Sequence, residues 1–144
     1  MDAQTPNILQ SLIEDFALFG DWEDRYRYLI DLGRTLPAMP EALKTESRLV
    51  RGCTSRVWMD SAVDAQGRFH FTADSDAHIV RGLIAVLDRA YQGISVSEIG
   101  AVDIQGAFAQ MGLEQNLSPS RRNGFYAMVE RIRGYATSVR HSEA

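Results

Sequence analysis

One short stretch of this 144-residue chain alternates apolar and polar side chains, and a turn divides it in two. Residues 55–63 alternate with period two, residues 68–73 alternate again, and Asp64-Ala65-Gln66-Gly67 between them has a turn composition. This pattern predicts an antiparallel hairpin, with Leu49 and Val50 as candidates for a further short strand. A sheet of this size has one buried face, so helices must cover it.

Apolar residues recur at helical spacing on both sides of the predicted hairpin. Caps, prolines and glycines set the expected helix bounds, which are Thr5-Pro6 to about residue 19, Asp21 to Gly33, Ala77 to Gln92, and Ser118-Pro119 to about residue 139. We expect the third helix to be largely buried and to be capped from the Asp74-Ser75-Asp76 cluster. Residues 37–46 are predicted as a loop, residues 96–111 as short amphipathic pieces, and residues 141–144 as a frayed tail.

The order of these elements predicts an α+β fold. We expect a single domain over residues 1–144, in which a small antiparallel β-sheet packs against several α-helices. A chain of this length buries enough surface for one core without help from metals or disulfides. No repeat or linker divides it.

Composition excludes several classes of function. Fifteen basic and nineteen acidic residues give a net charge of −4, which argues against a nucleic-acid partner bound through phosphate contacts. The single cysteine, Cys53, allows no internal disulfide, no four-cysteine zinc site and no redox pair, and no metal site is predicted. The single lysine, Lys44, lies in a polar stretch and is a poor candidate for a Schiff base.

No targeting or membrane-spanning segment is visible in the sequence. The first ten residues lack the basic-then-apolar order of a signal peptide, and no apolar run approaches about 18 residues. We therefore expect a soluble, cytoplasmic protein with no membrane partner. Thiols stay reduced in that compartment, so Cys53 is expected to be a free thiol.

The surroundings of Cys53 favour a reactive thiol. Gly52 precedes it and permits a positive φ, so that a tight loop can aim the next side chain. Arg51 and Arg56 flank it, and nearby positive charge favours the thiolate, which is the reactive form. The plain alternative is that Cys53 is a small buried hydrophobe, as most lone cytosolic cysteines are.

Two kinds of chemistry are open to a reactive Cys53. Hydrolysis needs a histidine to activate the thiol, and the candidates are His70, His78 and His141, each of which has the setting of a surface residue. Sulfur exchange needs only a suitable pKa and access. A chain with one cysteine and no evident catalytic partner fits exchange better than hydrolysis.

Several segments taken together resemble the SufE family, the sulfur-acceptor proteins of iron–sulfur cluster biogenesis. They cover almost the whole chain in order, and the most specific is the G-C-x-S-x-V-W core within Val50–Trp58. The others are Gly20–Tyr26 with Leu32-Gly33, Leu36-Pro37, Asp74–Leu83, and Leu117–Arg121 with Gly124.

The resemblance implies a fold like that of the IscU scaffold and a function that depends on partners. A pyridoxal-phosphate cysteine desulfurase of the SufS type would hold sulfur as a persulfide. Cys53 would take that sulfur and pass it to a SufB-like scaffold complex. The chain itself would bind no cofactor and would not be an enzyme alone. IscU-like proteins hold clusters through several cysteines, so one cysteine excludes that role.

Other residues receive roles from their position or from the resemblance. Asp76 and Arg121 match family positions and are candidates for docking or for stabilising the loop, although Asp76 could simply cap a helix and Arg121 could simply be solvated. Gly52 is a candidate hinge, Ser55 belongs to the same core, and Arg51 and Arg56 could tune the thiol or meet acidic partner groups.

Alternatives to the leading interpretation stay open on the sequence. One is a CsdE-like carrier for a related desulfurase, a second is a non-covalent adaptor, and a third is a cysteine hydrolase. The oligomeric state, monomer or homodimer, is also open.

Overall fold

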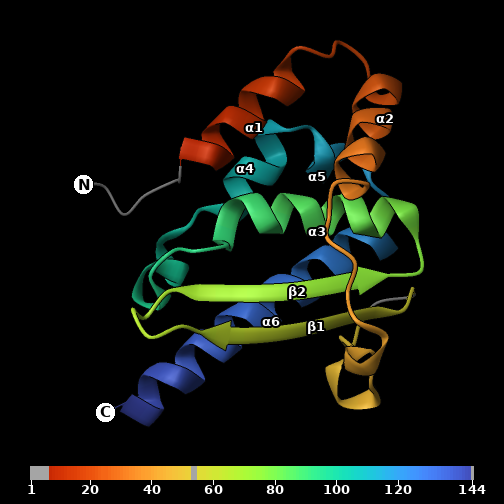
Figure 1. Cartoon of the computed structure of the whole chain (residues 1–144). Helices are drawn as coiled ribbons and strands as arrows, with labels where there is room; N and C mark the ends of the chain where they lie inside the picture. Colours follow the sequence, from red (N-terminus) through yellow and green to blue (C-terminus); the bar gives the residue numbers. More distant parts are fainter. Residues whose placement is uncertain (1–6, 53–54, 144) are drawn as a thin grey trace.

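The computed structural model describes residues 7–52 and 55–143. The elements in chain order are α1 (Asn7–Ala17), α2 (Trp22–Gly33), the 3₁₀ turns η1 (Glu41–Leu43) and η2 (Glu46–Arg48), β1 (Val57–Val63), β2 (Phe69–Ser75), α3 (His78–Tyr91), η3 (Val96–Ala101), α4 (Ile104–Gln110), α5 (Leu113–Asn116) and α6 (Pro119–Glu143) (Figure 1). The fold is α+β, as predicted.

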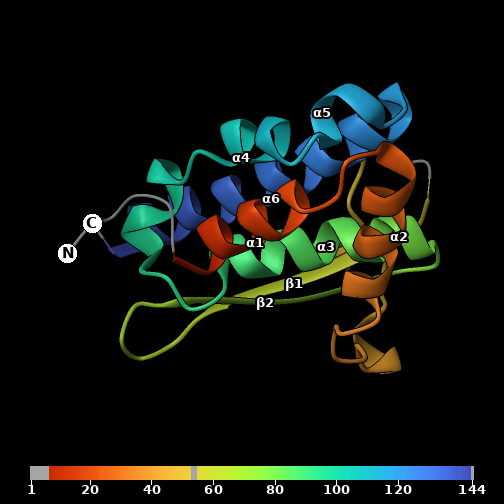
Figure 2. The ribbon, with the colours of Figure 1, turned by 90° about the horizontal axis from the view of Figure 1, so that it is seen from above.

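The two strands form an antiparallel hairpin whose register runs from Val57 opposite Ser75 to Val63 opposite Phe69. Because side chains alternate between faces, this register places a set of apolar residues on one buried face. These are Val57, Met59, Phe69, Phe71 and Ala73. Helices α3 and α6 lie on that side of the sheet (Figure 2). The predicted third strand is reduced to a single bridge between Leu49 and Trp58.

Helix α3 is the centre of the molecule. Ten of its fourteen residues are buried, and it packs against β2, α1, α2 and α6. Its predicted cap was wrong, because the N-cap is Ala77 and no side chain caps the helix. The Ser75 hydroxyl instead accepts the Ala77 amide at 3.2 Å. The Asp76 carboxylate turns away from the helix toward the backbone that precedes β1.

Helices α2 and α3 cross at two glycines. A Cβ atom on Gly33 would lie 2.7 Å from the Gly82 nitrogen, and one on Gly82 would meet the Leu29 carbonyl oxygen. Only glycine allows the two backbones to approach this closely.

The predicted cap of α2 is confirmed, since the Asp21 carboxylate accepts the Asp24 amide at 2.9 Å.

The second face of the sheet is covered at one end by the segment that holds η1 and η2, which lies on the opposite side of the strands from α3 and α6 (Figure 2). Lys44 lies over the Trp58 ring, with 5.4 Å between its nitrogen and the ring centroid. Arg48 pairs with Asp60 at 2.8 Å. The Trp58 ring is therefore packed between β1 and this covering segment.

Helix α6 begins at the predicted Ser118-Pro119 N-terminus, where the Ser118 hydroxyl accepts a hydrogen bond from the Arg121 amide at 3.3 Å. It continues to Glu143, beyond the predicted end near residue 139. The fraying expected for residues 141–144 stays a prediction. No glycine or proline follows Gly134 to interrupt it.

The predicted start of the first helix at Thr5-Pro6 lies outside the described residues. In the ranges that the structure covers, no helix combines the length and apolar character needed to cross a membrane.

Candidate functional site

Residues 51–56, here called the Cys loop, connect the Leu49–Val50 segment to the start of β1. The Val50 amide donates to the Val57 carbonyl at 2.8 Å and closes its base. Cys53 and Thr54 lie outside the described residues, so the site is defined by the residues on either side of them. The two ends of the loop are held together directly at the start of β1.

Asp76 holds the outgoing end of the Cys loop. Its carboxylate accepts the Arg56 amide at 3.2 Å, and its own amide donates to the Arg56 carbonyl at 3.4 Å. These two bonds continue the pairing of the hairpin beyond Val57 and Ser75. Asp76, which could have been a helix cap on the sequence alone, therefore binds the backbone at the end of the Cys loop.

Gly52 holds the incoming end against α6. Its φ is +93°, in the region that favours glycine. A Cβ atom at this position would lie 3.4 Å from the Cβ of Ala127 in α6. The backbone therefore runs close to the helix at the residue that precedes Cys53.

Arg131 on α6 fixes the segment that leads into the Cys loop. Its guanidinium donates to the Leu49 carbonyl at 2.9 Å and to the Ser47 carbonyl at 3.1 Å. The sequence analysis missed this residue. Nothing local identifies it, because its partners are more than eighty positions away in the chain.

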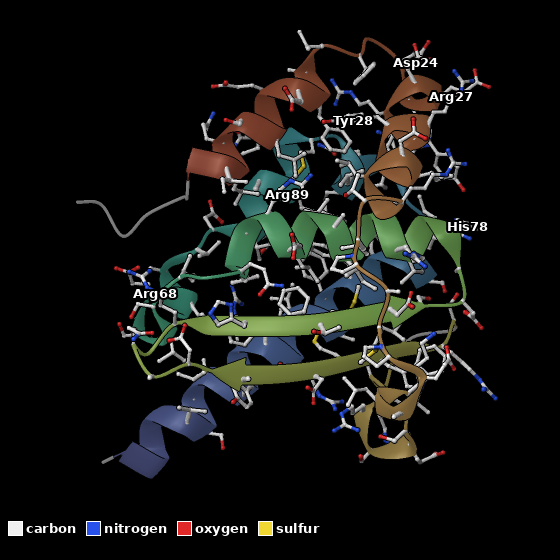
Figure 3. The ribbon with its side chains drawn as sticks, in the orientation of Figure 1. Asp24, Arg27, Tyr28, Arg68, His78 and Arg89 are labelled. Atoms are coloured by element: carbon white, nitrogen blue, oxygen red, sulfur yellow. The ribbon has the colours of Figure 1, made fainter. Side chains whose placement is uncertain are left out.

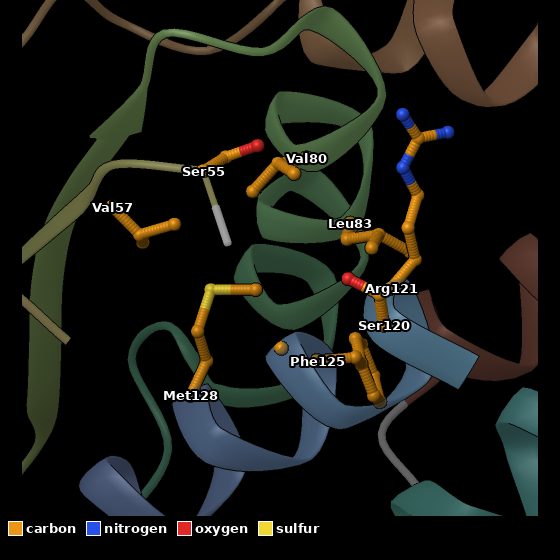
Figure 4. A pocket seen from close by; sticks show the side chains of 9 residues that line it. Ser55, Val57, Val80, Leu83, Ser120, Arg121, Phe125 and Met128 are labelled. Atoms are coloured by element: carbon orange, nitrogen blue, oxygen red, sulfur yellow. The ribbon is translucent and has the colours of Figure 1, made fainter. Parts of the chain in front are cut away.

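A small cavity lies beside the Cys loop, between β1, α3 and α6 (Figure 4). Its volume is about 280 Å³, including its open mouth. Apolar side chains make up most of its lining. The lining residues are Ser55, Val57, Val80, Leu83, Ser120, Arg121, Gly124, Phe125 and Met128.

Most of the residues predicted for the site come together here. Ser55 and Arg121 line the cavity, and the Arg121 guanidinium extends away from it (Figure 4). Arg51 and Arg56 are exposed on the loop, with Gly52 between the first of them and Cys53. The structure thus gathers residues from two distant parts of the sequence around one loop.

The histidines do not join this group. His70 is paired with Ala62, near the opposite end of the hairpin, and contacts Asp64 at 2.9 Å. His78 lies on the α2 side of α3 and lines a separate surface hollow with Ile30 and Arg34 (Figure 3). Neither lines the cavity beside the Cys loop, and the side chain of His141 lies outside the described part of the chain. Neither of the two histidines whose side chains are described therefore has the place beside the Cys loop that the base of a cysteine hydrolase would need.

Lys44 is engaged in ion pairs. Its nitrogen lies 2.9 Å from Glu41 and 3.3 Å from Asp74. The hydrogen bond to Glu41 is the main cause that raises the pKa of Lys44 above its ordinary value. The amine of Lys44 therefore stays protonated at neutral pH.

Fold and site together define a small α+β domain that presents one clamped loop beside an apolar cavity. The family model described as SufE, an Fe-S metabolism associated domain, matches residues 10–136. The chain therefore belongs to the SufE family.

Curated relatives agree with the family model over most of their own length. An uncharacterized SufE-like protein of Rhizobium etli is 45% identical over 87% of this chain and 86% of its own, and one of Rhizobium meliloti is 44% identical over 89% and 94%. The sulfur acceptor protein CsdE of Escherichia coli is 42% identical over 85% of this chain and 84% of its own.

A solved structure shares the fold. The solution structure of a hypothetical protein from Thermus thermophilus matches with a TM-score of 0.76 over 93% of this chain and 96% of its own. Its sequence identity is 21%, so the likeness concerns the fold alone.

Proposed function

We propose that this protein is a sulfur acceptor for, and activator of, a pyridoxal-phosphate cysteine desulfurase of the SufS type. On this proposal, Cys53 receives the persulfide sulfur and passes it to a SufB-like iron–sulfur scaffold complex. The observation that carries the proposal is membership of the SufE family together with a single cysteine inside the clamped loop. The chain binds no cofactor and turns over only through its two partners.

The transfer is a thiol–disulfide type of exchange. The Cys53 thiolate attacks the outer sulfur of the desulfurase persulfide. A new bond joins Cys53 to that sulfur, the old sulfur–sulfur bond breaks, and its electron pair leaves with the desulfurase cysteine as a thiolate. The proton stays with the transferred sulfur, so the step needs no external oxidant or reductant. The same exchange with a cysteine of the scaffold releases the sulfur again.

The surroundings of the Cys loop support a sheltered persulfide. A persulfide is readily lost to other thiols, and the cavity beside the loop is lined mainly by apolar side chains.

The rate at which Cys53 is alkylated tests whether the Cys53 sulfur is sheltered from solvent. We expect the free protein to react more slowly than a small-molecule thiol and the complex with the desulfurase to react faster. Equal rates in all three cases would remove the idea of shelter.

The central test is intact mass spectrometry of the protein after incubation with a SufS-type desulfurase, pyridoxal phosphate and cysteine. We expect the gain of one sulfur atom on Cys53, removed by reductant and absent from Cys53→Ser. Stimulation of sulfide release that survives in Cys53→Ser, without any sulfur gain in the wild type, would favour a non-covalent adaptor instead.

A second candidate is a CsdE-type carrier, which the 42% identity to the Escherichia coli sulfur acceptor protein CsdE favours. The two candidates share the chemistry and differ in the desulfurase that they serve. Parallel mass measurements with a SufS-type desulfurase and with the related desulfurase that a CsdE-like carrier serves distinguish them. The partner that loads Cys53 at the lower concentration is the one served.

A further inference from the structure

The guanidinium group of Arg131 binds one short segment of backbone. Its Nη1 atom donates to the Leu49 carbonyl at 2.9 Å, and its Nη2 atom donates to the Ser47 carbonyl at 3.1 Å. Among the described residues, Arg131 forms no salt bridge, and neither carbonyl accepts a hydrogen bond from a backbone amide. Hydrogen bonds from a charged donor are stronger than those between neutral groups. Residues 47–50, here called the entry segment, are therefore tied to α6 by this side chain.

The same face of α6 also carries the contact with Gly52. Ala127 lies one helical turn before Arg131, so the two side chains share a face of the helix. A Cβ atom on Gly52 would lie 3.4 Å from the Cβ of Ala127. Between these two points, the Val50 amide donates to the Val57 carbonyl of β1 at 2.8 Å. Two contacts with α6 and one with β1 therefore set the path by which the chain enters the Cys loop.

Burial holds the entry segment only at its end. Ser47 is exposed and Arg48 is half-buried, whereas Val50 is buried. The Arg48–Asp60 pair also links the segment to β1, at 2.8 Å, but a pair as exposed as this one contributes little. Loss of Arg131 should therefore loosen the entry segment without opening the core.

We propose that Arg131 is a positioning residue for sulfur transfer, because it fixes the segment from which the chain carries Cys53 to the partner's persulfide. The inference rests on the proposed function, since it adds a residue to that same reaction. Exchange between sulfur atoms requires that the attacking thiolate be aligned with the bond that breaks, and a displacement of about 1 Å can slow a reaction by up to about a hundredfold. Arg131 acts through backbone carbonyls, so its loss should change the rate of transfer and not the binding of the partner.

The test is the rate at which a SufS-type desulfurase, supplied with pyridoxal phosphate and cysteine, loads sulfur onto Cys53. Intact mass follows the loading at a series of desulfurase concentrations. Arg131→Met removes both donors and keeps an unbranched side chain. We expect its rate at saturating desulfurase to fall about tenfold, with the half-saturating concentration unchanged within about twofold. Arg131→Lys keeps a charged donor and should lose less than Arg131→Met.

Arg122 provides a matched control on the same helix. Its Nη1 atom donates to the Leu117 carbonyl at 2.9 Å and to the Glu114 carbonyl at 3.4 Å. Arg122→Met removes the same kind of contact from another segment and should load sulfur at the wild-type rate. Amide exchange at Val50 reports the entry segment directly. It should become about tenfold faster in Arg131→Met and stay unchanged in Arg122→Met.

Several outcomes would overturn the inference. They are an unchanged loading rate in Arg131→Met, an equal loss in Arg122→Met, and a loss seen only as a higher half-saturating concentration, which would assign Arg131 to partner binding. Alkylation of Cys53 by iodoacetamide against pH gives a further check. We expect the midpoint pH of Arg131→Met to equal that of the wild type, and a shifted midpoint would show that the charge of Arg131 acts on the thiol instead. If Arg131→Met does not fold, Arg131→Lys carries the same comparison.

Failure of this inference is distinguishable from failure of the proposed function. A wild type that takes up no sulfur would reject the sulfur acceptor, and exchange at Val50 would still show whether Arg131 holds the entry segment. Equal loading of the wild type and Arg131→Met would reject the positioning role and leave the sulfur acceptor intact.

Discussion

At the scale of single residues, Asp76 had two roles open on the sequence, a helix cap or a contact that stabilises the Cys loop. Its sequence position, just before a helix, is typical of a cap. In the structure it makes a pair of hydrogen bonds with the Arg56 backbone and closes the Cys loop. The hydrogen bond from the Arg56 amide requires an oxygen acceptor on the side chain at position 76, and it does not require a negative charge.

We therefore predict different outcomes for two substitutions of Asp76. Asp76→Ala removes the acceptor, and a hydrogen bond of this kind contributes about 1 kcal/mol. Amide exchange at Arg56 should become roughly five- to tenfold faster in this variant. Asp76→Asn keeps an oxygen acceptor and should exchange like the wild type. Equal acceleration in both variants would show that charge, and not the hydrogen bond, holds the loop.

Asp64 carries a pH-dependent contribution at the other end of the hairpin. One of its oxygens accepts the Gln66 and Arg68 amides and the other contacts His70, and the bond from Arg68 is the main cause that lowers the pKa of Asp64 below 3.8. A lowered pKa stabilises the folded state above the ordinary pKa, and the effect is lost as pH falls through the folded value.

We predict that wild type exceeds Asp64→Asn in unfolding free energy at about pH 6 and that the difference disappears by about pH 2. Urea denaturation at a series of pH values measures it. The asparagine retains an acceptor oxygen, so the comparison isolates the charge. A difference that stays constant over the acid range would contradict this account.

At the scale of elements, the contact between α2 and α3 depends on having no side chain at the crossing. Alanine is better than glycine in an isolated helix by about 1 kcal/mol. At Gly82 that gain is reversed, because the new Cβ would meet the Leu29 carbonyl. A Cβ atom on Gly134 in α6 would have no other atom within 4 Å, so alanine should show its helix-stabilising effect there.

We predict opposite signs for these two substitutions. Gly82→Ala should lower the unfolding free energy by about 1–3 kcal/mol through overpacking, while Gly134→Ala should raise it by about 0.5–1 kcal/mol. Chemical denaturation of both variants measures the difference. A neutral or stabilising Gly82→Ala would mean that the two helices can separate at little cost.

At the scale of the whole molecule, Asp74 joins three segments that are distant in sequence. It is buried at the end of β2, lies 3.3 Å from Lys44 of the covering segment, and pairs with Arg81 of α3 at 3.2 Å. Arg81 also reaches the Gly33 carbonyl of α2 at 3.5 Å. The charge network therefore connects the outer cover of the sheet to the helices on its other face.

We predict that Asp74→Asn lowers the unfolding free energy by about 2–4 kcal/mol, because it leaves the partly buried Arg81 without its carboxylate and Lys44 with only the exposed Glu41. Asp24→Asn, which breaks the exposed pair with Arg27, should change it by less than about 1 kcal/mol. Thermal or urea unfolding of both variants decides between them. Similar small losses would show that solvent already screens the Asp74 network.

The sequence by itself determined the local elements and the candidate reacting group. Alternation over two short segments placed the hairpin, and helical spacing placed the helices within a few residues, because these patterns reflect which face of each element is buried. A single cysteine between a glycine and arginines, with its flanking motifs, also pointed to the family that the comparisons then showed. These features depend on residues close together in the chain.

Only the tertiary structure decided which distant residues serve the Cys loop. The bonds from Asp76 to Arg56 and from Arg131 to Leu49 cross 20 and 82 positions of sequence, and the cavity takes its walls from β1, α3 and α6. Hydrogen bonds of this kind leave no periodic pattern, since either partner is an ordinary polar residue in its own element. Their existence follows from how the helices pack on the hairpin, and that packing is a property of the whole chain.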